Sequence, residues 1–243
     1  MSEGQKFEVP PKSHDPQSVE AVLEKGEIES AKELEGYWGI QLVKIKDDGD
    51  ALFRRDDATS IWFEEEGLEV RRSDLELIAY KIDQILEFNL IPTVTNRTIG
   101  EYNGSLQRRI SSFYDGHSVG WENDVRPEEI TRAAIFDYLL DVRDRHNGNF
   151  IIDADTDKLW LIDHDFFMFF REDFGAGARI VEKARMKGLV NLSEIEIASL
   201  ERFLANVDTL MIDAKPKVAE IIKKAVDRAK ILLKEGRIPT ANI

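Results

Sequence analysis

The stretch from Ile135 to Phe170 constrains this chain more than any other, and it reads IFDYLLDVRDRHNGNFIIDADTDKLWLIDHDFFMFF. Its apolar spacing predicts a helix that ends near Val142, followed by a polar loop. Two short apolar runs, 150–153 and 159–162, predict a pair of strands joined by a turn. A hairpin of this kind brings the start of its first strand beside the end of its second. The polar loop and Asp163, which follows the second strand, are therefore expected to share one site.

The polar loop carries the residue types that phosphoryl transfer uses. That reaction needs a carboxylate that orients the attacking hydroxyl and accepts its proton, together with amide and carboxylate oxygens that hold magnesium. Asp144 and Asn149 lie in the loop, and Asp163 follows the hairpin. Because Mg²⁺ prefers oxygen ligands, Asn149 and Asp163 can share one metal ion. A solvated, Asp-rich turn is the alternative, since short motifs have many false positives.

Two motifs in this stretch resemble those of a known superfamily. DRHNGN followed by IDHD is similar to the D-R-H-x-x-N and I-D motifs of the phosphatidylinositol 3-/4-kinase-like superfamily, which includes lipid kinases, HipA-type toxin kinases and secretory-pathway atypical kinases. The resemblance implies that Asp144 is the catalytic base and that Asn149 and Asp163 are the magnesium ligands. It also implies that Arg145 and His146 complete the catalytic loop.

The same resemblance assigns supporting roles around the loop. Arg145 and His146 are expected to brace it, and Asp137 in the FDYL segment is expected to anchor it. Asp165 follows the IDH segment, where it either adds a second carboxylate to the metal or faces solvent.

A hairpin signal lies in the first quarter of the chain. Asp48-Gly49 separates two apolar-alternating runs, QLVKIK and ALFRR, and predicts a tight turn between two strands. In a kinase-type fold this is the hairpin that covers the nucleotide. Gly36 and Gly39 precede it and would let backbone amides approach phosphate. An ordinary glycine turn is the alternative for this pair.

The second strand of this hairpin departs from the family pattern. The family places a phosphate-binding lysine in a phrase such as A-[IVL]-F-K-[PT], whereas this chain reads ALFRR with Arg54 at the lysine position. Arginine stays charged and can fork onto phosphate oxygens. The resemblance therefore carries the phosphate-binding role to Arg54, and a solvated strand end is the alternative.

Residues 71–88 predict an amphipathic helix with an apolar stripe. Ser73 and Glu76 have the spacing of a capping box at its start. The resemblance gives Glu76 a second interpretation, as the glutamate that pairs with Arg54. One rotamer does not easily serve both roles.

The segment after this helix extends the resemblance. LIPTV followed by GSLQ is similar to the V-P-x-T…G-S-[LF]-Q segment of bacterial and plant relatives of the phosphatidylinositol 4-kinases. There the segment enters the hinge beside the adenine. Gln107 is accordingly expected near the base and at the start of the hinge, and an ordinary strand after a glycine turn is the alternative.

The charge and composition of the chain limit the classes of partner and of site that we expect. The formal net charge of −14 repels phosphate backbones and anionic lipid surfaces at long range, which disfavours nucleic acid and, less strongly, a membrane lipid as substrate. The absence of cysteine excludes disulfides, thiolate metal sites and cysteine nucleophiles. No apolar run is long enough to span a bilayer and the N-terminus is polar, so we expect a cytoplasmic protein.

Together these patterns predict an α+β, two-lobed protein-kinase-like fold of the atypical, phosphatidylinositol 3-/4-kinase-like type. A flexible arm (1–18) precedes a β-rich N-lobe (19–110) and a helical C-lobe (111–243). The C-lobe is expected to contain a helix over 193–207, capped by Ser193 and Glu196, and a helix over 216–235.

The expected function is transfer of the γ-phosphate of ATP, with Mg²⁺, to a hydroxyl of a protein serine or threonine or of a small molecule. The alternatives are a nucleotide-binding pseudokinase that regulates a partner, a phosphatidylinositol kinase, or transfer of AMP instead of phosphate. The sequence does not name the acceptor.

Overall fold

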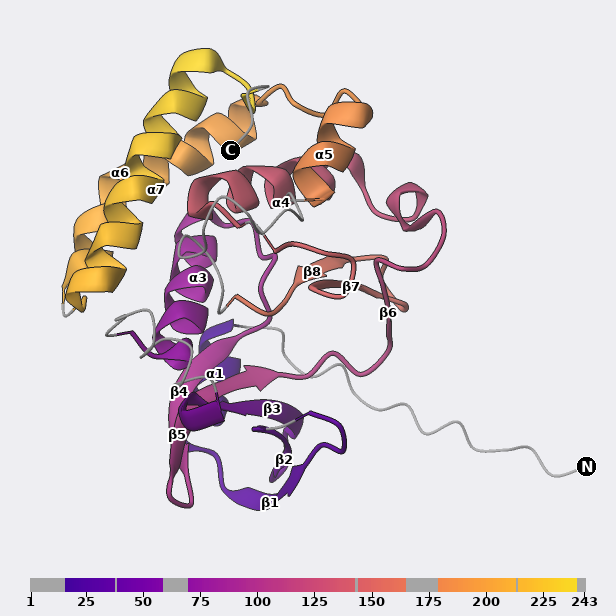
Figure 1. The fold of residues 1–243 in the computed structure, drawn as a ribbon, viewed down its shortest axis with the longest axis vertical. Helices are drawn as coiled ribbons and strands as arrows, with labels where there is room; N and C mark the ends of the chain where they lie inside the picture. The colour runs from indigo at the N-terminus through magenta and orange to yellow at the C-terminus, as the bar shows by residue number, and fades with distance from the viewer. Residues whose placement is uncertain are drawn as a thin grey trace, which may run out of the picture.

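The computed structural model describes residues 16–37, 39–58, 70–142, 144–164, 179–212 and 214–239. It has the expected α+β class, with an antiparallel sheet near the N-terminus and a group of helices toward the C-terminus (Figure 1). None of the helices in these ranges is long and apolar enough to cross a bilayer.

A five-stranded antiparallel sheet forms the N-terminal part, in the order β1-β2-β3-β5-β4. Side chains alternate between the two faces of a sheet. Phe53 and Leu106 pair on one face and pack against Leu23 of α1. Arg54 and Gln107 lie on the other face, toward α3. The elements of this part are α1 (Pro16–Lys25), β1 (Ile28–Glu33), β2 (Ile40–Ile45), β3 (Gly49–Arg55), η1 (Asp56–Ala58), α3 (Arg72–Leu86), β4 (Val94–Ile99) and β5 (Tyr102–Arg108).

The hairpin predicted at Asp48-Gly49 is confirmed, since Gly49 begins β3 with φ 108°. Helix α1 stops at Lys25, and Ile28 starts β1, a strand that was not predicted. Gly26 explains the stop: a Cβ at this position would lie 2.5 Å from the carbonyl oxygen of Val22.

The capping box predicted at Ser73 is also wrong. The N-cap of α3 is Arg71, and Asp74 at position N3 accepts the backbone N–H of Arg71 at 3.2 Å. Ser73 lies inside the helix, where its backbone N–H and its hydroxyl both donate to Asp56 at 2.9 Å. Glu76 is therefore not a capping residue, and its side chain is fully buried.

Four helices and a small sheet form the C-terminal part, with α4 at the centre of the main core. Helices α6 and α7 lie side by side on the outer side of the C-terminal part (Figure 1). The predicted cap of α6 is confirmed, because Ser193 and Glu196 form a capping box. The elements are β6 (Phe113–Asp115), η2 (Trp121–Asn123), α4 (Pro127–Leu140), β7 (Phe150–Asp153), β8 (Leu159–Leu161), α5 (Arg179–Met186), α6 (Glu194–Met211) and α7 (Pro216–Glu235).

Two features of this part differ from expectation. Strand β6 was not predicted; it pairs with β7, which gives the three-stranded order β6-β7-β8. Helix α5 was not predicted. The β7–β8 hairpin itself is as expected, with Phe150 opposite Leu161.

Candidate active site

Arg145 holds the two ends of the β7–β8 hairpin together. Its side chain is fully buried, and Nη1 donates to the carbonyl oxygens of Asn149 at 2.6 Å and Ile162 at 2.7 Å. Nε and Nη2 donate to Asp137 of α4 at 3.1–3.2 Å. The contact of Arg145 with Asp137 fits the expectation that Asp137 anchors the loop. Arg145 has no exposed surface and its donors are used internally, which fits the bracing role expected of it.

Asp144 and Asn149 lie next to each other in the loop before β7. The side-chain nitrogen of Asn149 donates to the backbone oxygen of Asp144 at 3.0 Å and lies 3.5 Å from its Oδ2. Burial raises the pKa of Asp144 to about 6, Arg145 opposes the shift, and the charges of Asp163 and Asp137 add to it. A carboxyl group with such a pKa suits a general base near neutral pH.

His146 shapes the turn of the loop from an exposed position. Its Nδ1 accepts the backbone N–H of Gly148 at 3.0 Å. This contact fits the bracing role that was expected of His146.

Asp163 follows β8 in the left-handed conformation, with φ 62°. Its Oδ1 accepts a hydrogen bond from Nη2 of Arg72 at 2.9 Å. Arg72 starts α3 and is nearly buried. Arg72 was not predicted from the sequence, although a cation in the first turn of a helix interacts unfavourably with the positive end of the helix dipole and could have been noticed for that reason.

Glu76 connects the sheet to the segment that carries Asp163. Its Oε1 lies 3.7 Å from Nη1 of Arg54 and accepts the backbone N–H of His164 at 3.2 Å. Burial alone would raise the pKa of Glu76, but the charge of Arg54 and the hydrogen bond with His164 outweigh it and lower the pKa to about 2. The interpretation of Glu76 as the partner of Arg54 is therefore the one that the structure contains.

His164 is buried beside this carboxylate. Its ring stands edge-on to Phe136, with the ring centroids 5.9 Å apart, and burial lowers the pKa of His164. The residue after Asp163 is thus packed between Glu76 of α3 and Phe136 of α4.

Arg54 lies across the inner face of the sheet. Its exposed fraction is 6%, and Nη1 donates to Oε1 of Gln107 at 3.0 Å. The alternative of a solvated strand end is therefore wrong for Arg54. Three buried polar atoms here, Nε of Arg54, Nε2 of Gln107 and Oγ of Ser105, have no hydrogen-bond partner among the described residues.

The two glycines expected near phosphate lie in the β1–β2 turn, before the predicted hairpin. Gly36 and Gly39 have φ values of 84° and 73°. A Cβ on Gly39 would lie 2.1 Å from that of Ala58, so close packing requires a glycine there. The turn adjoins the Arg54 end of the sheet, since Ile40 pairs with Arg54.

The residues fit a magnesium ion. Asn149 donates through its nitrogen, which turns its amide oxygen away from Asp144, and Asp163 supplies a carboxylate. The carboxylates of Asp163 and Asp137 add to the burial that raises the pKa of Asp144, and a cation would offset that negative charge. No group of three or more His, Cys, Asp or Glu ligands occurs in the described ranges. Two oxygen ligands, completed by water and phosphate, are what Mg²⁺ commonly uses.

The residues also fit a nucleotide. The unsatisfied donors of Arg54, Gln107 and Ser105 are groups that phosphate or a base would satisfy, because unpaired buried polar atoms are costly. Asp165, for which a metal role or a solvent position was expected, lies outside the described residues. So do residues 1–15 of the arm expected over 1–18, whereas residues 16–18 belong to α1.

The sequence matches no protein-family model and no curated protein. Among solved structures, the crystal structure of the golgi casein kinase aligns over 90% of this chain and 74% of that chain, with 13% identity and a TM-score of 0.57. The HipA protein complex with HipB and its operator DNA from Shewanella oneidensis MR-1 aligns over 93% and 74%, with 12% identity and a TM-score of 0.44.

The first similarity shows that the chain has a kinase-like α+β fold, and the second is too low to add to that conclusion. At such low identities the likeness concerns the fold alone. Membership of the phosphatidylinositol 3-/4-kinase-like group remains a prediction.

Proposed function

We propose that the chain is an ATP- and Mg²⁺-dependent phosphotransferase that moves the γ-phosphate to a hydroxyl of a protein serine or threonine or of a small molecule. The observation that carries this proposal is the position of Glu76, which contacts Arg54 on one side and the backbone of His164 on the other. This carboxylate joins the proposed phosphate-binding cation to the proposed metal-binding segment in one buried unit.

Each residue then has a defined task. Asp144 orients the acceptor hydroxyl and takes its proton, for which a pKa of about 6 is suitable. Arg54 binds phosphate oxygens and is held by Glu76. Asn149 and Asp163 would hold Mg²⁺, which when bound neutralises charge on the phosphates.

The test combines binding with transfer. A ligand that binds only the folded protein raises its melting temperature, so ATP with Mg²⁺ should stabilise the wild type and Asp144→Ala, but not Asp163→Asn. Intact mass after incubation with ATP and candidate acceptors should show added phosphate with the wild type and none with Asp144→Ala. Addition of AMP would instead indicate nucleotide transfer. No stabilisation of the wild type at any ATP concentration would refute the proposal.

A second candidate is a nucleotide-binding module without turnover. The ion pair of Arg72 with Asp163 at 2.9 Å favours it, because it occupies a carboxylate oxygen that magnesium needs. ATP-dependent stabilisation that needs no Mg²⁺, together with no transfer to any acceptor, would support this candidate over the enzyme.

A further inference from the structure

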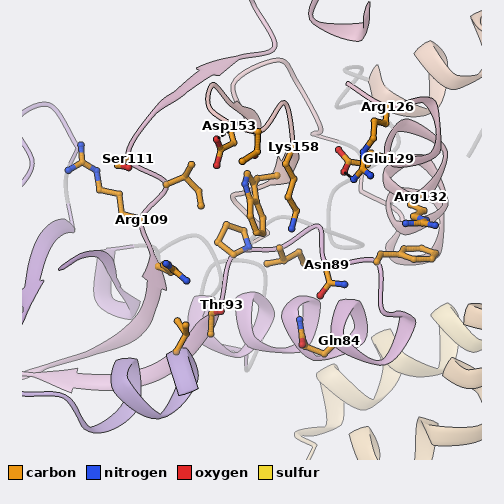
Figure 2. Close-up of a pocket in the computed structure, with 18 residues that line it drawn as sticks. Gln84, Asn89, Thr93, Arg109, Ser111, Arg126, Glu129, Arg132, Asp153 and Lys158 are labelled. Carbon is orange, nitrogen blue, oxygen red and sulfur yellow. Dashed lines mark hydrogen bonds and ion pairs between the residues drawn. The ribbon is translucent and has the colours of Figure 1, made fainter. Parts of the chain in front are cut away.

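A cavity of 880 Å³ lies apart from the candidate active site (Figure 2). Its walls come from the end of α3, the segment after it, the connection from β5 to β6, the first turns of α4, and the turn of the β7–β8 hairpin. None of the proposed catalytic, nucleotide or metal residues lines it. The hairpin carries Asn149 at one end and the cavity wall at its turn, so the two sites lie at opposite ends of β7 and β8.

The cavity is basic, although the chain has a net charge of −14. Two carboxylates line it, and both are engaged. Glu129 pairs with Arg126 and accepts the backbone N–H of Leu159 at 2.9 Å, and Asp153 accepts backbone N–H groups of its own turn. The cations that line it are Arg108, Arg109, Arg126, Arg132 and Lys158.

Three of these cations have acidic partners. Arg109 pairs with Asp50 at 3.0 Å and Arg132 with Glu196 at 3.2 Å, while Arg126 pairs with Glu129. Arg108 and Lys158 differ, because neither forms an ion pair with any residue in the described ranges. The cavity therefore holds two positive charges that have no ion-pair partner among the described residues, while Glu129, Asp83 and Asp153 act on Lys158 only at longer range.

Lys158 is the more informative of the two. It is partly buried, its Nζ lies 3.7 Å from the ring centroid of Trp160, and burial lowers the pKa of its ammonium group. Figure 2 shows the side chain extending into the cavity toward Asn89. A partly buried cation that has no direct ion-pair partner is costly, so an anionic ligand would stabilise Lys158 there.

The rest of the lining is a mixture of apolar and uncharged polar side chains. The apolar ones are Val19, Phe88, Ile91, Pro92, Ile110 and Trp160, and the polar ones are Gln84, Asn89, Thr93, Ser111 and Thr156. Small-molecule sites in proteins are concavities of roughly 300–1,000 Å³ that combine apolar side chains with placed polar groups, and the volume of this cavity lies in that range.

We propose that this cavity binds a small organic anion with an apolar body, whose phosphate or carboxylate group pairs with Lys158 and Arg108. The inference does not depend on the proposed phosphotransferase activity, because it uses none of the residues of that site.

The test is calorimetric titration of the full chain with 1-naphthyl phosphate, which combines an aromatic body with a dianionic group. We expect saturable binding that Lys158→Gln and Arg108→Gln each weaken at least ten-fold. Lys44→Gln is the matched control, because Lys44 is an exposed lysine on β2, and it should bind as the wild type does. Inorganic phosphate and 1-naphthol should each bind at least ten-fold more weakly than 1-naphthyl phosphate.

Two outcomes would overturn the proposal. One is the absence of saturable binding to a wild type that melts cooperatively. The other is binding that Lys158→Gln and Arg108→Gln leave unchanged but Arg54→Gln abolishes, which would place the ligand in the nucleotide site. Unchanged melting temperatures of the unliganded variants establish that a loss of binding is local.

Discussion

Arg72 donates from Nη2 to Oδ1 of Asp163 at 2.9 Å, although the two residues are 91 positions apart. The guanidinium group of Arg72 thus forms a hydrogen-bonded ion pair with the carboxylate that we propose as a magnesium ligand. Removing it with Arg72→Gln leaves Asp163 with more uncompensated negative charge. We therefore expect the Mg²⁺ concentration needed for half-maximal stabilisation by ATP to fall about ten-fold, a change of about 1.4 kcal/mol. A thermal-shift titration with Mg²⁺ at fixed ATP measures this.

The control for this change is Arg71→Gln. Arg71 pairs with Asp74 at 2.9 Å and lies next to Arg72 in the sequence, so its loss alters the charge of the chain without touching Asp163. A higher magnesium requirement in Arg72→Gln would contradict competition and would give Arg72 a direct role in holding phosphate.

Asp144 should control the pH dependence of the reaction. Burial raises its pKa to about 6, with the charges of Asp163 and Asp137 adding to the shift. A general base works only when deprotonated, so the rate should fall as the pH drops through about 6. Carboxyl ¹³C resonances of aspartate-labelled protein, with Asp144→Asn identifying the signal, would give the pKa directly. A titration near pH 4 would contradict this prediction.

The local parts of the site could be predicted from sequence because their residues are close together in the chain. The loop with Asp144 and the hairpin from Phe150 to Leu161 depend on turn chemistry and apolar runs within one short stretch. The Ser193–Glu196 cap is local for the same reason, since both residues belong to one helix turn.

The other features of the fold and the site depend on contacts between residues far apart in the chain, which a local sequence pattern does not contain. Ser73 and Glu76 have capping-box spacing, yet Glu76 points instead to Arg54 and to His164, which is 88 residues away. Glu76 is buried in the tertiary structure and does not cap the helix, and Arg71 and Asp74 form the capping box instead. Arg72 was not predicted because its partner Asp163 is 91 residues away along the chain.

Glu76 should also be a major contributor to stability. It is fully buried between Arg54 and His164, and removing one partner from a buried ion pair costs about 3–5 kcal/mol. Glu76→Gln should lose that amount at pH 7, measured by urea unfolding. Because the pKa of Glu76 is lowered to about 2 in the folded protein, its contribution is present above the ordinary glutamate pKa and is lost as the pH falls from about 4.5 toward 2.

Glu220→Gln is the control for this prediction. Glu220 also has a pKa lowered to about 2, through hydrogen bonds with Lys217 and Lys224, but it lies at the surface of α7. Exposed pairs contribute about 0–1 kcal/mol. Equal losses in the two variants would contradict a special role for Glu76.

Asp83 should make the protein less stable as the pH rises. Its carboxylate is buried and accepts the backbone N–H groups of Leu90 and Ile91 at 3.0–3.1 Å. Burial raises its pKa to about 7, and those hydrogen bonds oppose the shift. The folded state then holds a proton that the unfolded state releases, so the free energy of unfolding falls between about pH 4 and pH 7.

Asp83→Asn should flatten this slope, because the amide keeps an oxygen acceptor and cannot ionise. Urea unfolding at several pH values between 4 and 8 tests it. Asp208→Asn, at an exposed position on α6, should keep the slope of the wild type. A variant at Asp83 with the slope intact would show that another group is responsible.

Arg54 is the cation that we propose binds phosphate, and its contacts indicate how it can do so. Its Nη1 donates to Gln107 and lies near Glu76, while Nε has no partner among the described residues. A single cation held in this way can still present donors to phosphate, so Arg54→Gln should raise the Kd for ATP about ten-fold or more. Arg54→Lys keeps the positive charge opposite Glu76 and should retain most of the affinity for ATP, because the ion pair depends on the charge more than on the planar geometry of the guanidinium group.

Arg109→Gln, which removes a cation paired with Asp50, is the matched control and should bind ATP normally. Equal ATP affinity in Arg54→Gln and the wild type would show that Arg54 serves the fold alone, because its only remaining tasks would be the contacts with Gln107 and Glu76.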